Sequence, residues 1–240
     1  MTAERQENLV RGQSETVFKV FGAIYDFITD HPLWYQQNVA LMAHFGDRAA
    51  APRVLDLGCG TGVGTLAVAE RLPDRSTIVG VDLTPEMIAR AQLYHQKRHP
   101  DLSHISFERA DATQLRFDEA TFDVAMANSF LYLVPDPQRV LREVRRVLAP
   151  GGRMVLMEPH AGGSIVRAAF YSATRPQVWL RHPLASLRMV AAMAAWRIFS
   201  GLAGRRSIEE QRRMIEAAGF SSVRFEPTLG GLGVHVIAER

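Results

Sequence analysis

Apolar residues fall into short runs that alternate with polar, helix-forming stretches along most of the chain. Runs of this length predict buried strands, and stretches with apolar positions three and four apart predict helices. Strands that alternate with helices indicate an α/β fold with a parallel sheet and right-handed crossovers. The predicted strands are 54–57, 76–81, 105–110, 121–129, 153–157, 223–227 and 234–238.

The same pattern divides the chain into consecutive parts. Residues 1–52 predict N-terminal helices, 53–159 carry alternating strands and helices, 160–206 form an insertion, and 207–240 form a helix and two strands. The last helix is expected to begin at Ser207, a capping residue followed by two acids. A length of 240 residues is sufficient for one domain, 1–240, with a substantial core.

Composition narrows the function classes. Hydrophobic residues make up 47% of the chain, which predicts a globular protein rather than a disordered or membrane-spanning one. The formal net charge of +3 is too small to argue for a nucleic-acid partner. The sole cysteine cannot form an intrachain disulfide, and no histidine and carboxylate cluster has metal-ligand spacing. Residues 1–14 lack the apolar centre of a secretory signal, so a cytoplasmic location is expected.

The most informative motif is the turn after the first predicted strand, D-L-G-C-G-T-G over residues 56–62. Glycines tolerate positive φ and let a ligand lie against the backbone, and the helix behind them offers unpaired N–H groups. Asp56 would repel a pyrophosphate but attract a cofactor that carries an ammonium group. Val63 stands where the dinucleotide fingerprint needs its third glycine, and no lysine follows as in a P-loop. The alternative is a tight turn without a ligand.

Two further acids follow predicted strands. Asp82 lies near the end of the second strand, where an acid of a doubly wound sheet commonly accepts hydrogen bonds from ribose hydroxyls. A helix cap is the alternative, although Thr84 supplies a start signal of its own. Leu83 and Met87 would then lie against the adenine or the sugar. Asp111 follows the third strand, and a loop aspartate without a ligand is its alternative.

These motifs together resemble a known enzyme family. The turn over 56–62 resembles motif I of the class I S-adenosylmethionine-dependent methyltransferases, and the passage from Phe122 to Gly152 resembles the corresponding family block. Residues 21–26, before Trp34, are similar to the UbiE-like branch, which includes quinone C-methyltransferases. The resemblance implies a Rossmann-like, doubly wound sheet of seven strands, mostly parallel with the last strand antiparallel. It also implies S-adenosyl-L-methionine as the cofactor.

The resemblance assigns cofactor contacts at the ends of several strands. Asp111 would accept from the exocyclic amine of adenine, with the backbone N–H of Ala112 donating to the ring. Tyr25 would fold over the cofactor and help to close the site, or alternatively pack the N-terminal helix against the sheet. The cofactor-binding candidates are Tyr25, Asp56, Gly58, Cys59, Gly60, Gly62, Asp82, Leu83, Met87, Asp111, Ala112, Asn128 and Ser129.

The methyl acceptor should lie at the carboxyl ends of the strands, near the switch in strand order. His160 is the candidate base, because imidazole titrates near neutrality; a surface histidine is the alternative. Tyr25 is a second catalytic candidate. Tyr132 stands where many family members have histidine, which leaves the base open. The substrate-binding candidates are His31, Tyr35, Tyr132, Glu158 and His160.

The insertion has an unusual composition, with seven arginines and no acid between residues 161 and 206. Aromatic and methionine residues between the arginines suit a helical lid over an apolar acceptor. Peripheral contact with an anionic membrane and plain packing helices are the alternatives. Arg188 and Arg197 are nine residues apart and so on opposite helix faces, which weakens the membrane interpretation.

The leading hypothesis is a methyltransferase that acts on a hydrophobic small molecule such as a quinone-like ring, an isoprenoid or a secondary metabolite. An RNA or protein methyltransferase on the same core is an alternative, but no Asn-Pro-Pro-Tyr-like tetrapeptide follows the fourth strand and no RNA-binding unit is appended. A cofactor-binding protein without turnover is the third hypothesis. The sequence leaves a homodimer open.

Overall fold

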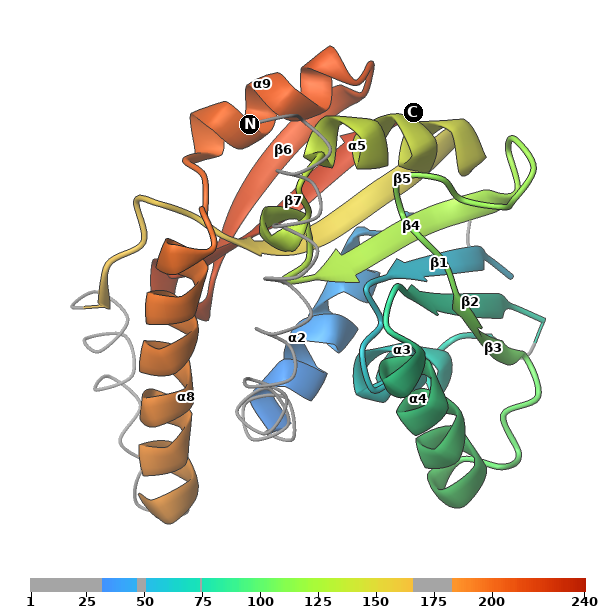
Figure 1. The fold of residues 1–240 in the computed structure, drawn as a ribbon, viewed down its shortest axis with the longest axis horizontal. Helices are drawn as coiled ribbons and strands as arrows, with labels where there is room; N and C mark the ends of the chain where they lie inside the picture. Colours follow the sequence, from blue (N-terminus) through green and yellow to red (C-terminus); the bar gives the residue numbers. More distant parts are fainter. Residues whose placement is uncertain (1–31, 47–50, 74, 166–182) are drawn as a thin grey trace, which may run out of the picture.

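A mixed sheet of seven strands forms the centre of the computed structural model, which describes residues 32–46, 51–73, 75–165 and 183–240 (Figure 1). The strand order is β3-β2-β1-β4-β5-β7-β6, and β7 is antiparallel to both of its neighbours. All seven predicted strands are present, and the predicted doubly wound topology is confirmed. The strands are β1 (Arg53–Leu57), β2 (Thr77–Asp82), β3 (Ile105–Arg109), β4 (Phe122–Asn128), β5 (Leu148–Pro159), β6 (Ser221–Thr228) and β7 (Gly233–Glu239).

Helices cover both faces of the sheet (Figure 1). One apolar cluster joins the sheet to α5 and α9, and a second joins its other face to α2 and α3, with Trp196 of α8 included. A third, smaller cluster packs α3 and α4 against β3. The helices are α2 (Pro32–Leu41), α3 (Val63–Ala69), α4 (Pro85–Arg98), α5 (Pro137–Val147), α8 (Pro183–Leu202) and α9 (Ile208–Ala217), with short 3-10 turns η1 (Met42–His44), η2 (Leu131–Leu133) and η3 (Leu229–Gly231).

Helix ends follow the signals in the sequence. Ser207 and Glu210 form a reciprocal capping box at the start of α9, and Asp136 caps α5 through the backbone N–H of Arg139. Proline occupies the first position of α4 and α5, where its missing N–H has no partner to lose. Local residues therefore determine where these helices begin.

Strand β5 differs from its prediction. The sequence predicts a helix stop at residues 149–152 and a strand from Arg153, whereas β5 already begins at Leu148. Leu148 pairs with Phe122 and Arg153 with Val124, so the register shifts between these pairs. The prolyl and glycyl residues after α5 thus form an irregularity within the strand rather than a separate loop.

The topology places a crevice at the centre of the sheet. The chain runs from β1 outwards through β2 and β3 and then crosses to β4 on the other side of β1. Ligands of open α/β sheets bind at the carboxyl ends of strands at such a switch point. The segments that follow β1 and β4 therefore border the expected site. Helix α8 stands at this end of the sheet (Figure 1).

The insertion is described in part, from 160 to 165 and from Pro183 onwards. Helix α8 is a single helix of 20 residues. Trp196 on it is buried, whereas Val190, Ile198 and Leu202 are exposed. No helix in the described ranges combines the length and apolar character needed to cross a bilayer.

Candidate active site

The turn after β1 has the backbone conformation that its glycines permit. Gly58, Gly60 and Gly62 have φ of 65°, 54° and 78°, a region that other residues rarely adopt. Gly62 is the N-cap of α3, so the unpaired N–H groups of that helix begin at this turn. A Cβ added at Gly58 would lie 2.4 Å from the Phe130 ring. The turn therefore depends on glycine for both its conformation and its close packing.

Asp56 lies in β1, two residues before Gly58, and its exposed fraction is 4%. Its Oδ2 accepts a hydrogen bond from Thr65 Oγ1 of α3 at 2.6 Å. Burial raises the pKa of Asp56 to about 7, and the nearby Asp82 raises it further while the Thr65 bond opposes the rise. A cation bound nearby would stabilise the charged carboxylate. A buried carboxyl group at this position therefore favours a cationic ligand over an anionic one, in the direction predicted from the sequence.

Asp82, the last residue of β2, is attached to the glycine turn. Its Oδ2 accepts from the N–H of Gly60 at 3.1 Å, and its Oδ1 accepts from the N–H of Thr84 at 2.8 Å. Burial raises the pKa of Asp82, and these backbone bonds oppose the rise. Each oxygen of a carboxylate has a second lone pair. Contact with ribose hydroxyls is thus compatible with the observed bonds, and Thr84 rather than Asp82 is the N-cap of α4.

Three neighbouring candidates differ in exposure. Leu83 is 53% exposed beside Asp82, whereas Met87 is buried in α4. The N–H of Cys59 donates to Val81 at 3.0 Å. Burial raises the pKa of the Cys59 thiol, which keeps it protonated and unreactive at neutral pH. Cys59 therefore serves the turn through its backbone and its small size.

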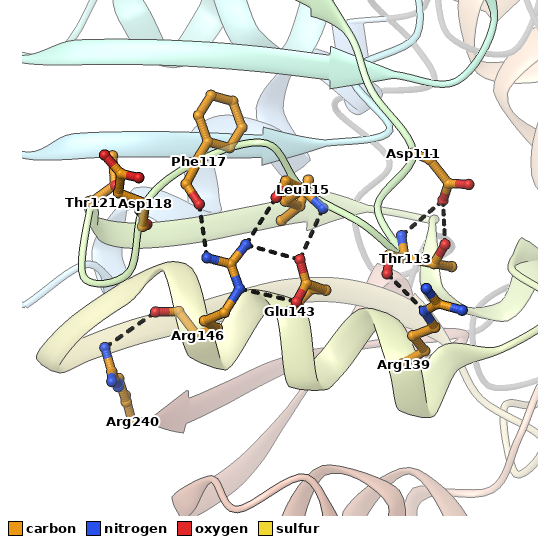
Figure 2. Close-up of polar contacts among 10 residues, drawn as sticks. All are labelled: Asp111, Thr113, Leu115, Phe117, Asp118, Thr121, Arg139, Glu143, Arg146 and Arg240. Carbon is orange, nitrogen blue, oxygen red and sulfur yellow. Dashed lines mark hydrogen bonds and ion pairs between the residues drawn. The ribbon is translucent and has the colours of Figure 1, made fainter.

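The loop that follows β3 carries Asp111 and Ala112. Asp111 Oδ1 accepts from the N–H of Thr113 at 2.8 Å and from its hydroxyl at 2.7 Å. The other carboxylate oxygen points away from Thr113 (Figure 2). Arg139 of α5 donates from Nε to the Thr113 carbonyl at 3.0 Å. Thr113, near the start of the loop, is thus bound both by Asp111 and by Arg139.

Further along, the same loop is held against α5 by an ion pair. Arg146 donates to Glu143 from Nε at 3.0 Å and from Nη2 at 2.9 Å. The pair also binds the loop backbone: Glu143 accepts from the N–H of Leu115, and Arg146 donates to the carbonyls of Leu115 and Phe117. Figure 2 shows this arrangement along α5. We call Arg139, Glu143 and Arg146 the α5 clasp; it positions the loop that contains Asp111.

Asn128 ends β4, directly after the cross-strand pair of Leu57 and Ala127. It therefore lies opposite the start of the glycine turn. Its side-chain Oδ1 is buried and has no hydrogen-bond partner among the described residues. A buried acceptor without a donor costs about 1–3 kcal/mol. A donor group of a ligand would remove this cost.

Glu158, near the end of β5, has backbone partners rather than an open face. Its Oε1 accepts from the N–H groups of Phe130 and Leu131 at 2.9 and 2.7 Å, and its Oε2 from that of Tyr132 at 3.3 Å. The residue is 1% exposed. Burial raises the pKa of Glu158 to about 7, and the three N–H groups oppose the rise. Contact of Glu158 with an acceptor stays a prediction, which this geometry disfavours.

Helix α8 meets the segment after β4 through aromatic side chains. Trp196 Nε1 donates to Ser129 Oγ at 3.2 Å. The rings of Tyr132 and Phe199 meet edge to face, with centroids 6.4 Å apart. Ser129 has φ of 57°, and its N–H donates to the Met157 carbonyl at 2.7 Å. Ser129 and Tyr132 thus each contact α8 at this end of the sheet, and their roles toward cofactor and acceptor stay predictions.

Arg197 corrects one expectation about the insertion. The packing-helix alternative expects its arginines to be solvated, but Arg197 donates to the carbonyls of His160, Ala161 and Gly163. Its guanidinium therefore fastens α8 to the segment that leaves β5. Such an engaged group does not offer its charge to a membrane surface.

His160 follows β5 directly and is 8% exposed, so the surface-histidine alternative is wrong. Its Nε2 lies 3.0 Å from the carbonyl oxygen of Gly231, near the end of η3. A carbonyl only accepts, so Nε2 carries the proton and a neutral ring has its lone pair on Nδ1. The geometry thus selects a tautomer with the lone pair on Nδ1.

Some candidates lie outside what the structure describes. Tyr25 and His31 precede the first described residue, and the side chain of Tyr35 is not described. Their roles stay predictions. Within the described ranges, no group of three or more histidine, cysteine or acidic side chains could hold a metal ion.

Sequence reasoning missed several residues that position the site. Thr65 had a usable signal, a hydroxyl in the first turn of the helix after the glycine motif. The sequence had no usable signal for Phe130, Trp196 and the α5 clasp, because their partners are distant in the chain. Trp196 and Ser129, for example, are 67 residues apart.

Comparison with known proteins agrees with this architecture. The methyltransferase-domain family matches residues 49–191. A demethylmenaquinone methyltransferase of Shouchella clausii is 31% identical over 160 residues, covering 65% of this chain and 65% of the relative. Another, from Bacillus pumilus, is 25% identical and covers 99% of both chains. The chain thus spans about two thirds of the first relative and nearly all of the second.

A solved structure shows the same fold. An S-adenosylmethionine-dependent methyltransferase from Aquifex aeolicus superposes with a TM-score of 0.60 at 16% identity, over 84% of this chain and 88% of the other. S-adenosylmethionine is the cofactor of the family to which these matches point. The glycine turn, the acids at or near the ends of the first three strands and the family match agree: the chain belongs to the class I S-adenosylmethionine-dependent methyltransferases.

Proposed function

We propose that this protein transfers the methyl group of S-adenosylmethionine to a hydrophobic small molecule. The buried Oδ1 of Asn128, without a partner among the described residues, fits the ammonium group of the cofactor, and the nearby Asp56 fits its charge. Asp82 would accept from the ribose hydroxyls and Asp111 from the adenine amine. Bound there, the cofactor supplies an electrophilic methyl carbon on a sulfonium. The chain's own residues align the two reactants and exclude water, the largest contributions to such a displacement.

The class of acceptor follows from the side chains at the carboxyl ends of β4 and β5. Phe130, Tyr132, Trp196 and Phe199 gather there from two segments, joined by the contacts of Tyr132 with Phe199 and of Trp196 with Ser129. These aromatic groups suit a planar, apolar ring. The gathering of these four aromatic residues is the single observation that supports a hydrophobic acceptor over a nucleic acid or a protein.

Within this class we propose a quinol ring carbon. The relatives named demethylmenaquinone methyltransferases support this choice. Methylation at a ring carbon would form one C–C bond while the methyl–sulfur bond breaks and S-adenosylhomocysteine leaves. The ring carbon then loses its proton, so the reaction benefits from a base. His160, buried directly after β5, is the proposed proton acceptor, because imidazole titrates near neutrality.

A labelling experiment tests the proposal. The purified protein is incubated with methyl-labelled S-adenosylmethionine and a chemically reduced 2-prenyl-1,4-naphthoquinone, and the lipid extract is analysed by mass spectrometry. We expect label on the ring of the reduced compound and none on the oxidised control. Absence of label from the quinol, in a protein that binds the cofactor, would reject a quinol acceptor.

A further inference from the structure

Residues 129–132, which we call the β4 turn, connect three parts of the site. The first residue, Ser129, has φ of 57°, a strained conformation that residues other than glycine rarely adopt. Such a conformation persists only when surrounding contacts hold it. The β4 turn should therefore have identifiable anchors. Besides the backbone bond from Ser129 to Met157, the described residues supply two side-chain anchors.

The first anchor is Glu158. One buried carboxylate accepts the N–H groups of Phe130, Leu131 and Tyr132, and so all three residues after Ser129 are bound to the end of β5. A carboxamide at this position would have only one accepting oxygen and would direct N–H groups at N–H groups. The two oxygens of the carboxyl group are thus matched to the three N–H groups of this backbone.

The second anchor is Trp196 of α8. It is 3% exposed, and its indole N–H donates to Ser129 Oγ at 3.2 Å. An indole has a single donor and no acceptor, so this bond fixes its ring against the turn. Because α8 belongs to the insertion, the contact links the acceptor side of the site to the strained residue.

The β4 turn also touches the cofactor side. The Phe130 ring lies against Gly58, within 2.4 Å of where a Cβ would be. The turn therefore packs between the glycine turn and α8. A displacement of either anchor would move the surface against which the acceptor lies relative to the cofactor site.

We propose that Glu158 and Trp196 are positioning residues, which hold the β4 turn so that the acceptor is aligned with the cofactor's methyl group. This inference rests on the proposed function. We expect loss of either anchor to slow methyl transfer without weakening cofactor binding. Neither anchor belongs to the glycine turn, and neither is one of the three cofactor-binding acids Asp56, Asp82 and Asp111.

A double-mutant cycle tests the Trp196 anchor. Trp196→Phe keeps an aromatic ring but removes the donor, and Ser129→Ala removes the acceptor. We expect kcat for the reduced prenyl-naphthoquinone to fall about tenfold in each variant, and the double variant to be no slower, because all three lack the same bond. The dissociation constant of Trp196→Phe for S-adenosylmethionine, measured by calorimetry, should stay within about twofold of the wild-type value. If the two single-variant losses in kcat multiplied in the double variant, or if kcat were unchanged in Trp196→Phe, Trp196 would not be an anchor of the β4 turn.

Glu158→Gln and Glu158→Asp test the other anchor. Glu158→Gln should lower kcat, and amide hydrogen exchange at residues 130–132 should become faster, because their N–H groups lose acceptors. Glu158→Asp retains the carboxylate and should recover part of both. Exchange at 130–132 that is as slow in Glu158→Gln as in the wild type would contradict the anchoring role.

Ile198→Ala is the matched control on α8, since Ile198 is 66% exposed and lies two residues from Trp196; its kinetics should equal those of the wild type. Failure of the two proposals can be distinguished. A wild type that binds the cofactor but does not methylate the quinol refutes the proposed acceptor. Hydrogen exchange at residues 130–132 needs no acceptor, and comparing the wild type with both Glu158→Gln and Trp196→Phe still decides whether Glu158 and Trp196 hold the β4 turn.

Discussion

At the scale of single residues, the buried carboxylate of Asp56 is the clearest sign of a functional compromise. Its pKa is raised to about 7, chiefly by burial, so the charged form is disfavoured in the folded protein. Its partner in the described residues is the Thr65 hydroxyl. A buried charge that lowers the unfolding free energy of the ligand-free protein is typical of a site that binds a ligand of opposite charge.

Asp56→Asn should therefore change stability and binding in opposite directions. A folded-state pKa above the unfolded value means that the carboxyl group lowers stability once pH exceeds about 4, fully so above pH 7. At pH 8 we expect the unfolding free energy of the ligand-free variant to rise by about 1–2 kcal/mol, measured by urea denaturation. Affinity for S-adenosylmethionine should fall about tenfold. A variant that is destabilised and binds normally would contradict this role.

The same residue predicts how cofactor binding depends on pH. A bound ammonium favours the ionised carboxylate and lowers its pKa, so binding should release protons near pH 7 and weaken as pH falls below that value. Calorimetry in buffers of different ionisation enthalpy measures the release directly. Asp56→Asn should reduce this proton release, because the variant has no carboxyl group at position 56.

His160→Ala tests the proposed base. The ring is buried and bonded to Gly231, so its loss should reduce kcat for the quinol by about 10²–10⁴-fold if it accepts the proton. Cofactor affinity should stay close to that of the wild type, since His160 lies outside the cofactor contacts. His160→Gln keeps a polar side chain of similar size but removes the base, so it separates packing from proton transfer. A near-normal kcat in both variants would exclude His160 as the base.

At the scale of elements, α5 does more than cover one face of the sheet. Its clasp binds the backbone of the loop after β3 at Thr113, Leu115 and Phe117. Arg146 beside Glu143 holds the pKa of that carboxyl below its usual range, so the pair stays charged at neutral pH. A rigid helix thus fixes the loop that carries Asp111.

Glu143→Gln should loosen that loop. The variant loses charge-assisted bonds to Arg146 and an acceptor for Leu115, and we expect about a threefold to tenfold weaker affinity for S-adenosylmethionine. Glu209→Gln is the matched control, because it breaks the exposed ion pair with Arg213 on α9. Equal calorimetric affinities of the two variants would show that the clasp does not support the cofactor site.

Elements with local signals could be predicted from the sequence, and elements set by distant partners could not. The seven strands and the starts of α4, α5 and α9 follow from apolar runs and capping residues. The early start of β5 depends on pairing with β4 across a register shift. The partners of Glu158 lie 26 to 28 residues away, so the sequence could place Glu158 at the site but could not show what it binds.

At the scale of the whole molecule, the strand order converts separate motifs into one site. The glycine turn, Asp82, Asp111 and Asn128 follow four different strands, and only the order β3-β2-β1-β4 brings them to one edge. The motif spacing predicted this convergence. A helical lid over this edge is the favoured interpretation of the insertion's sequence, but its arginine-rich composition cannot show which residues of α8 contact the segment after β4.

The function proposed for this protein depends on binding of S-adenosylmethionine at this edge of the sheet. Calorimetric titration of the purified protein with the cofactor and with S-adenosylhomocysteine at pH 8 tests this binding. We expect saturable heat with one site per chain for both compounds, and weaker binding in Asp56→Asn. No heat with either compound, from protein shown to be folded, would contradict the proposed function.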